Sequence, residues 1–196
     1  MKKIISYESL KLVMDKFLVI FLLPFFIIII PFIIILIILD SKGSPFFIQT
    51  RVGKNEKLFK IIKFRTMYLD TPNISTEDLE KLNVNTITKV GNFLRRTSLD
   101  ELPQIINVLV GEMSFVGPRP ALPTQIDVIK LRRRHGVNYI LPGITGLAQV
   151  RGRDNLNTEE KCELDRVYAK NASIYLDLRI LFIETVRVVL SNRGNK

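Results

Sequence analysis

The sequence is poor in the residues that build disulfides and transition-metal sites. Cys162 is its only cysteine, so an intrachain disulfide is impossible, which points to a reducing compartment such as the cytosol for the soluble part. His135 is its only histidine, which argues against a zinc site of the usual Cys/His kind. The chain also lacks a Walker A spacing, a G-x-G-x-x-G fingerprint and an internal repeat. It is therefore neither a P-loop, a Rossmann nor a repeat protein.

Acidic residues are few compared with basic ones. The chain has 29 Lys and Arg against 19 Asp and Glu, a formal net charge of +10 over 196 residues. Such a balance favours anionic partners: nucleic acid, membrane headgroups or phosphorylated substrates. No basic stripe interleaved with aromatic residues is present, so nucleic acid is the weakest of the three. The length suits one domain with a sizeable core.

Charge is absent from one long segment near the start. In residues 17–39 every residue is Phe, Leu, Ile or Val, apart from Pro24 and Pro31. On an insertion scale the apolar residues contribute about −6 to −12 kcal/mol, which outweighs two proline penalties of about 3 kcal/mol each. The run is too long for a signal peptide, and no small-x-small cleavage site follows it. We expect this segment to enter the bilayer.

Two topologies fit the apolar segment. A straight helix would be about 34 Å long and could span a hydrocarbon core of about 30 Å. Basic residues flank both ends, however, and the positive-inside rule then favours both ends in the cytoplasm. That requires a re-entrant helix-break-helix, with Pro24 or Pro31 at the break. The residues alone support the two nearly equally, and the re-entrant form is our prediction. The flanking basic residues are Lys2, Lys3, Lys11, Lys16, Lys42, Arg51 and Lys54.

The predicted fold is α+β and mostly helical, with a membrane-embedded segment at 1–42 and a cytoplasmic catalytic domain at 43–196. Short aromatic or β-branched runs at 46–50 and 58–64 flank turn residues and predict a small β-hairpin. Polar residues 70–85 predict a surface excursion with a weak helix signal.

Three later stretches have the apolar spacing of amphipathic helices. The first, 126–135, is basic and can lie on anionic headgroups. The other two are 158–169 and 174–191. The apolar stripe of the last one includes Leu178 and Phe182, and it predicts core packing, with contact at the membrane interface as the alternative.

Two adjacent carboxylates, Asp100 and Glu101, precede an apolar helical pattern and are predicted to lie in the first turn of a helix. Ser98, three residues before Glu101, matches a capping box, and Pro103 suits a first turn. From the pair alone, a favourable interaction with the helix dipole is the better interpretation. Fixed beside a cation such as Arg95, the pair can also hold a metal ion or attack a phosphorus atom.

Two other stretches carry arginines in rigid surroundings. Pro118 and Pro120 flank Arg119, which in isolation is best interpreted as a loop arginine. Residues 141–154 combine glycines with arginines, among them Arg153, and such a stretch can offer N–H groups and guanidinium forks to phosphates.

Together these stretches resemble the bacterial sugar transferase family, small monotopic phosphoglycosyl transferases that act on polyprenyl phosphate. The motifs occur in family order over residues 43–190, which is far more specific than any one motif. They are KFRTM at 63–67, SLDELPQ at 98–104, NVL-x-G-x-MS-x-VGPRP at 107–120, PGITG-x-AQV-x-GR at 142–153 and LD-x-x-YxxNxS-x-x-LD at 164–177.

The resemblance implies a two-step transfer of a phosphosugar from a nucleotide diphosphosugar, such as a UDP-sugar, to polyprenyl phosphate. The carboxylate that matches Asp100 attacks the donor and expels nucleoside monophosphate. Glu101 matches the partner acid that is assigned to Mg²⁺. The resemblance further implies the bacterial inner membrane, a catalytic domain that faces the cytoplasm, and the first membrane step of glycoconjugate assembly. The residues that match substrate-binding positions are Arg95, Arg119, Arg153 and Lys63.

The chain departs from the family pattern in two places. Family members usually carry a Ser-Pro break about 13 residues after an aspartate that Asp15 matches, whereas this chain has prolines only at 24 and 31 of the run. Asp154 replaces the usual asparagine after Gly-Arg. The chain resembles the short form of the family, without an upstream multi-helix region. A non-catalytic basic membrane anchor, which binds lipid or recruits partners, is the alternative function, and it would make Asp100 dispensable.

Overall fold

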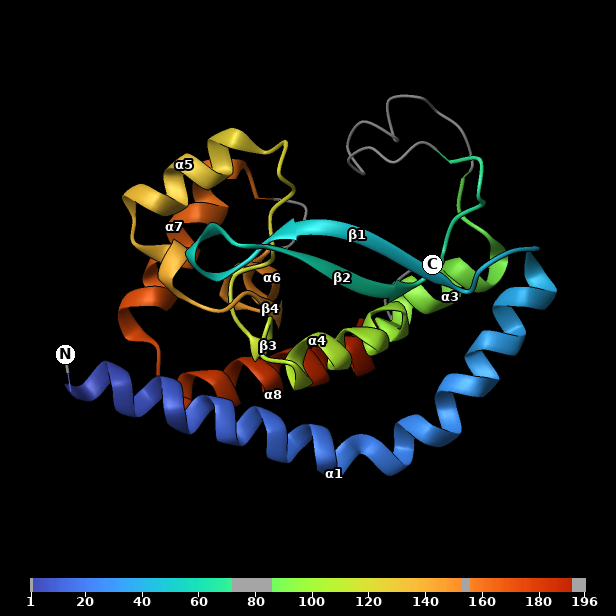
Figure 1. Cartoon of the computed structure of the whole chain (residues 1–196), viewed down its shortest axis with the longest axis horizontal. Coiled ribbons are helices and arrows are strands. Elements are labelled where there is room, and N and C mark those ends of the chain that lie inside the picture. Colours follow the sequence, from blue (N-terminus) through green and yellow to red (C-terminus); the bar gives the residue numbers. More distant parts are fainter. Residues whose placement is uncertain (1, 72–85, 153–155, 192–196) are drawn as a thin grey trace.

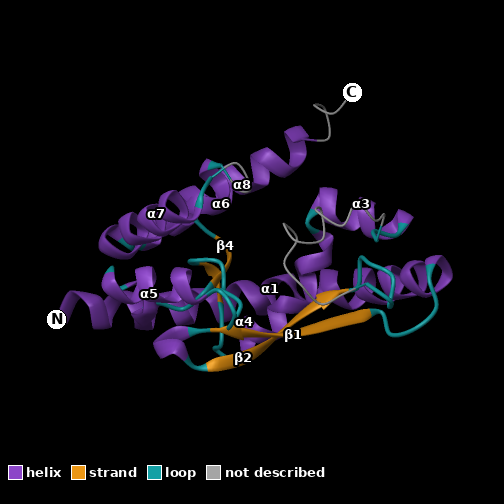
Figure 2. Cartoon of the chain, turned by 90° about the horizontal axis from the view of Figure 1, so that it is seen from above, coloured by secondary structure: helices purple, strands orange, loops and turns teal. Residues whose placement is uncertain are grey.

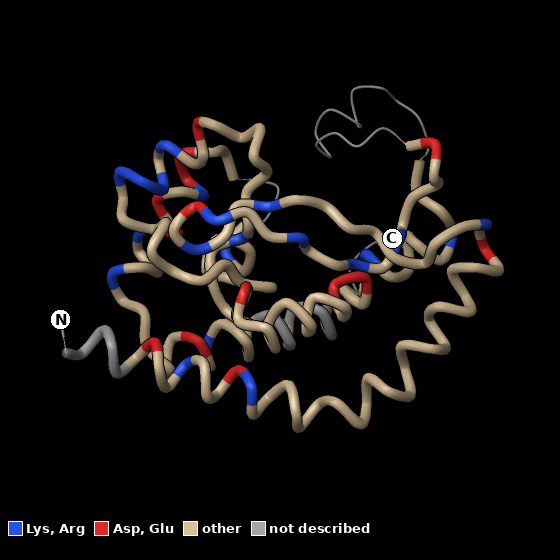
Figure 3. The backbone as a smooth tube through the Cα atoms, viewed as in Figure 1, with Lys and Arg blue, Asp and Glu red and all other residues tan. Residues whose placement is uncertain are grey.

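A single long helix, α1 (Lys2–Asp40), runs along one side of the molecule and bends toward the rest of the chain (Figure 1). The structure is a computed structural model and describes residues 2–71, 86–152 and 156–191. The portion Tyr7–Asp40 is long and apolar enough to cross a membrane. Figure 3 shows that the long middle of α1 carries no Lys, Arg, Asp or Glu. These features indicate that the helix associates with a membrane.

The bend of α1 follows from the position of its prolines. Pro24 and Pro31 are both exposed and lie seven residues apart, close to two turns, so they share one face of the helix. The opposite face is buried against the body by Val19, Phe26 and Ile33. A proline ring pushes against the carbonyl one turn before it and bends the helix away from itself, so the two kinks add. The expected break is not confirmed, because the helix continues through both prolines.

Both ends of α1 are bonded to the same body. Near its start, Lys11 donates to the buried carboxylate of Asp177 at 2.6 Å. At its end, the guanidinium of Arg65 donates to the carbonyl oxygens of Ser41 at 2.5 Å and Lys42 at 2.9 Å. The helix therefore curves along the body and touches it at both ends.

The predicted hairpin is confirmed. Strands β1 (Phe46–Val52) and β2 (Leu58–Phe64) pair antiparallel, with Phe46 opposite Phe64, and the 3-10 helix η1 (Lys54–Glu56) forms the turn. The Asn107 side chain attaches this hairpin to the next layer, because it accepts from the Ile62 N–H at 3.2 Å and donates to the Lys60 carbonyl at 2.8 Å.

A second, parallel strand pair was not predicted from the sequence. Strands β3 (Ser114–Val116) and β4 (Gly143–Thr145) are each three residues long, which is too short for a recognisable pattern. Glycine permits their close approach: a Cβ on Gly143 would lie 2.0 Å from the Gly117 nitrogen. The contact brings together two of the motifs found in the sequence.

The helix predicted to start at Ser98 has a different form. Helix α3 (Lys89–Thr97) ends at Ser98, which has a left-handed φ of 57° and makes no side-chain cap, so the capping box is wrong. Ser98 is instead the C-cap of α3, and its N–H bonds back to Arg95 and Leu94. The acidic pair lies in a 3-10 helix, η2 (Leu99–Gln104), followed by the short α4 (Ile105–Leu109). Pro103 has no N–H for an α-helical bond, which favours the tighter turn.

The later helices are α5 (Ile126–Arg134), η3 (Val137–Tyr139), α6 (Leu147–Arg151), α7 (Thr158–Asn171) and α8 (Ile174–Ser191). Of these, α5, α7 and α8 agree with the sequence prediction in position, whereas η3 and α6 were not predicted. On α8 the predicted core stripe is wrong at Leu178 and Phe182, which are 53% and 70% exposed, while Leu181 of that stripe packs against the buried Ile180 cluster. Exposed apolar side chains also occur on α4. The predicted excursion at 70–85 lies mostly outside the described residues.

Figure 2 shows the hairpin on one side of α4 and α1, and α7 and α8 on the other. Side chains from α1, β2 and α4 share a buried cluster that includes Phe26, Phe59 and Val108. The hairpin is thereby fixed against the turn that carries the acidic pair.

Candidate active site

Two cationic side chains from distant parts of the chain, Lys63 and Arg119, meet at Glu101. The Lys63 ammonium lies 2.6 Å from the Glu101 Oε1, and the Arg119 Nη1 lies 3.3 Å from the same oxygen. Lys63 and Glu101 are largely buried, with 13% and 16% of their side chains exposed, whereas Arg119 is 53% exposed. The cluster therefore has a closed inner pair and an open outer arginine.

Each element contributes to the cluster for a local reason. Lys63 is near the end of β2, which packs on η2 and brings the lysine to Glu101. Arg95 lies in the last turn of α3, and its Nε donates to the Thr66 hydroxyl at 2.9 Å. Arg119 lies in the loop that follows β3.

The two adjacent carboxylates have opposite electrostatic environments. Burial raises the pKa of Asp100 above its ordinary value, although Lys63 and Arg119 oppose the shift. Burial alone would also raise the pKa of Glu101, but Lys63 and Arg119 lower it to about 2. Glu101 is thus an ionised partner of two cations at neutral pH, while Asp100 is the more basic group of the pair.

Arg51 belongs to the same site, and the sequence reasoning considered it only as a flanking charge. Its Nη1 donates to the Pro120 carbonyl at 3.1 Å, and its Nη2 donates to Gln49 Oε1 at 2.5 Å. Burial, together with the nearby Arg119, lowers the pKa of Arg51 to about 10, while Glu101 opposes the shift. One signal could have identified it: Gln49 and Arg51 are two apart on a strand, so they share a face.

The structure thus brings together five of the six residues singled out from the sequence. Arg153 lies outside the described residues. The five are Asp100, Glu101, Lys63, Arg95 and Arg119, and electrostatic interactions link Asp100 to each of the other four.

The acidic pair has the oxygen chemistry that suits Mg²⁺. This ion is commonly held by one or two carboxylates together with phosphate oxygens of a substrate. Within the described residues no group of three or more His, Cys, Asp or Glu side chains could hold a metal. The donor set of Asp100 and Glu101 therefore fits Mg²⁺ that is shared with a phosphorylated substrate.

Comparisons with known proteins agree with the motifs. The family model described as bacterial sugar transferase matches residues 6–192. The uncharacterized sugar transferase EpsL of Bacillus subtilis is 42% identical over 190 residues, which cover 94% of this chain and 89% of that protein.

Two relatives have names that specify a reaction. The undecaprenyl-phosphate galactose phosphotransferase of Salmonella typhimurium is 38% identical over 169 residues, 78% of this chain and 34% of that protein. The UDP-glucose:undecaprenyl-phosphate glucose-1-phosphate transferase of Escherichia coli is 42% identical over 153 residues, 74% of this chain and 32% of that protein. The chain thus spans about a third of the length of these two relatives. By the match along nearly its whole length, the chain belongs to the bacterial sugar transferase family.

Proposed function

We propose that the chain is a phosphoglycosyl transferase that moves a phosphosugar from a nucleotide diphosphosugar, most simply a UDP-sugar, to polyprenyl phosphate. The observation that carries the proposal is the arrangement around Asp100: a partly buried carboxylate of raised pKa beside Glu101, Lys63, Arg95 and Arg119. Phosphoryl transfer needs positioning and charge neutralisation more than any other contribution, and these side chains can supply both.

The first step would use Asp100 as nucleophile. A carboxylate oxygen of Asp100 attacks the β-phosphorus of the donor and forms an acyl phosphate. The bond from that phosphorus to the bridging oxygen breaks, and nucleoside monophosphate leaves with the electron pair. Arg119 is half exposed at the mouth of the cluster and can bind the diphosphate with its planar fork.

The second step would restore the enzyme. A phosphate oxygen of polyprenyl phosphate attacks the same phosphorus, the bond to Asp100 breaks, and the carboxylate is regenerated. Glu101, with Asp100, would hold Mg²⁺, which when bound offsets negative charge on the phosphates. Lys63 keeps Glu101 ionised and in place.

We also propose that α1 is re-entrant and that the catalytic domain lies on the cytoplasmic face of the inner membrane. Both ends of α1 bond to one body, which supports a segment that enters and leaves the bilayer on one side. Exposed apolar side chains on two other helices support a body seated in the interface. They include Ile106 and Leu109 on α4 and Tyr175, Leu178 and Phe182 on α8.

The test of the function is release of nucleoside monophosphate from a panel of nucleotide-sugars by detergent-purified protein with polyprenyl phosphate and Mg²⁺. We expect release with at least one donor, and its loss in EDTA. Release that survives EDTA would refute the metal role. No release from any donor would favour the non-catalytic membrane anchor.

The covalent step has its own test. With donor alone, the protein should release one equivalent of nucleoside monophosphate in a burst and gain the mass of a phosphosugar on the peptide that contains Asp100. Release that depends strictly on both substrates together, with no modified peptide, would show direct transfer instead.

A further inference from the structure

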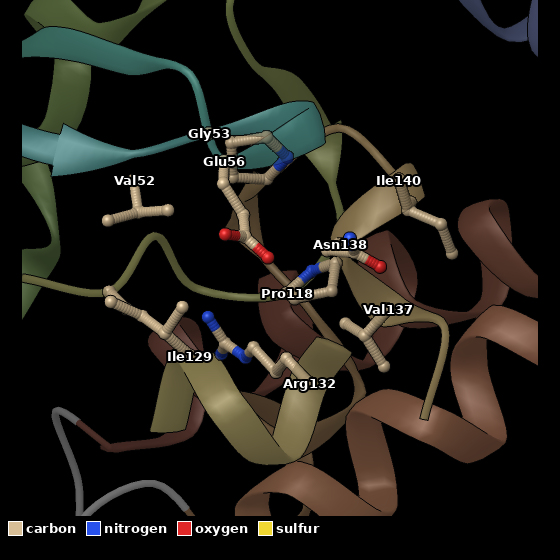
Figure 4. Close-up of a pocket in the computed structure, with 11 residues that line it drawn as sticks. Val52, Gly53, Glu56, Pro118, Ile129, Arg132, Val137, Asn138 and Ile140 are labelled. Carbon is tan, nitrogen blue, oxygen red and sulfur yellow. The ribbon is translucent and has the colours of Figure 1, made fainter. Parts of the chain in front are cut away.

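Arg132 on α5 has two partners that link the C-terminal motif to the active site. Its Nε and Nη2 donate to Asp165 Oδ2 at 3.0 and 2.7 Å, and its Nη1 donates to the Arg119 carbonyl at 2.8 Å. The side chains of Arg132 and Asp165 are only 15% and 2% exposed. Figure 4 shows Arg132 beside Pro118 in the wall of a small pocket.

The loop that carries Arg119 is held at four consecutive carbonyl oxygens. Arg132 holds the Arg119 carbonyl, and Arg51 holds that of Pro120 at 3.1 Å. The backbone N–H of Gly143 bonds to the Pro118 carbonyl and that of Val52 to the Ala121 carbonyl, each at 2.9 Å. β1, β4 and α5 thus each bond to the backbone of one short segment.

The fixed backbone of this loop matters because the Arg119 side chain is half exposed and its bond to Glu101 is long, at 3.3 Å. An exposed arginine has many rotamers, so the direction of its guanidinium depends on where the backbone places its Cα. The two prolines beside it already restrict the chain. The hydrogen bonds to the four carbonyl oxygens further restrict the backbone of the loop.

We infer that Arg132 and Asp165 are positioning residues, which aim Arg119 at the donor diphosphate by fixing the Arg119 carbonyl from behind. Asp165 compensates the buried guanidinium, and Arg132 transmits its position to the loop. The inference rests on the proposed function for the role of Arg119. It gives the first half of the LD-x-x-YxxNxS-x-x-LD motif a task at the active site, although Asp165 touches neither substrate.

A double-mutant cycle tests the inference. Arg132→Ala should lower kcat/KM for the nucleotide-sugar about ten- to a hundredfold, mainly through KM, because displacement of a binding group by about 1 Å has effects of this size. In an Arg119→Ala background, the same change should cost less than about twofold, since the effect passes through Arg119. Equal losses in both backgrounds would overturn the inference.

Two further variants separate positioning from charge and from general stability. Arg132→Lys keeps the charge near Asp165 but cannot bridge to the carbonyl at the same time, so it should resemble Arg132→Ala. Full activity in the lysine variant would show that charge alone suffices and overturn the inference. Arg133→Ala is the matched control, because Arg133 is on the same helix as Arg132 but is exposed and pairs with Glu56 of the hairpin turn. It should change kcat/KM less than about twofold.

A readout without catalysis keeps this inference distinct from the proposed function. Hydrogen exchange at the amides of Val52 and Gly143 reports the two backbone bonds to the loop. Asp165→Asn should accelerate exchange at both amides, and the exposed control Glu163→Gln should not. If wild-type protein has no transferase activity, the proposed function fails, and these amides still decide the positioning role. Unchanged exchange in Asp165→Asn would refute it.

Discussion

At the scale of single residues, the adjacent carboxylates Asp100 and Glu101 are divided by their surroundings. Both are at least partly buried, but among the residues that the structure describes it is Glu101 whose carboxylate forms ion pairs, with Lys63 and Arg119. The opposite pKa shifts of the pair match a division into nucleophile and supporting acid.

Replacement of Asp100 should therefore separate activity from folding. We expect Asp100→Asn to lose turnover by at least about a thousandfold, because an amide cannot attack phosphorus. Its thermal midpoint should equal or exceed that of wild type, since the variant removes a buried charge that burial disfavours. Turnover and thermal unfolding are measured in detergent, with the exposed Asp127→Asn as control. Near-normal turnover would make Asp100 a structural residue.

The contribution of Glu101 to stability should depend on pH. Its pKa falls from 4.5 to about 2 on folding, so its contribution is fully present above about 4.5 and is lost as the pH falls through about 2. The stability difference between wild type and Glu101→Gln should shrink when the pH is lowered across this window. A difference that stays constant would show that Glu101 is not ionised in the folded protein.

Loss of Lys63 should be more harmful than loss of the whole ion pair. Lys63→Met leaves the Glu101 carboxylate buried with a weaker partner set, and removal of one member of a buried pair costs about 3–5 kcal/mol. The double variant Lys63→Met/Glu101→Gln should recover most of that stability but not the activity. Equal destabilisation by the single and double variants in denaturant unfolding would contradict this reasoning.

At the scale of elements, the start of α1 is attached to α8 by a buried polar group. The Asp177 carboxylate is fully buried and accepts from Tyr7 at 2.9 Å, Lys11 at 2.6 Å and Tyr168 at 2.6 Å. Three donors from two helices, α1 and α7, therefore meet at one carboxylate on α8.

This attachment predicts a specific defect. Lys11→Met should lower stability by about 3–5 kcal/mol, because it removes the ammonium from the buried ion pair and leaves Asp177 with hydroxyl donors. It should also make the chain between α1 and the body more sensitive to limited proteolysis. The exposed Lys16→Met on the same helix is the control. Equal proteolysis of the two variants would show that α1 is held mainly by its apolar face.

The sequence predicted those elements whose signals are local. The hairpin and the helices α5, α7 and α8 follow from alternation or helical spacing over six or more residues. The strands β3 and β4 were missed because three residues carry no period, and because a glycine contact across the fold creates the pair. The form of η2 was missed because Ser98 is used by the preceding helix.

The site was predictable where a motif contains the residues, and not where the fold supplies them. Asp100 and Glu101 are adjacent in sequence and have characteristic neighbours. Arg51 and Arg132 reach the Arg119 loop from 69 and 13 residues away, so no spacing could indicate their role. The acceptors, moreover, are backbone carbonyl oxygens, which every residue has, so the sequence does not show which of them are bonded.

At the scale of the whole molecule, the bent α1 predicts the topology. With Cys162→Ser as background, Lys3→Cys and Ser44→Cys should both resist an impermeant thiol reagent in intact cells and react once the inner membrane is opened. The reason is that both ends of α1 bond to one body. Labelling of Lys3→Cys alone in intact cells would establish a single span, although the catalytic assignment could stand.

The seven-residue interval between Pro24 and Pro31 sets the phase of the two kinks. One alanine inserted between them would rotate the second kink by about 100° around the helix axis. The two bends would then lie in different planes, and the end of α1 would move away from the body. The hydrogen bond that the Asp40 carboxylate accepts from the Val90 N–H, at 2.8 Å, would be lost. The segment between the two prolines should therefore tolerate a substitution far better than an insertion or a deletion.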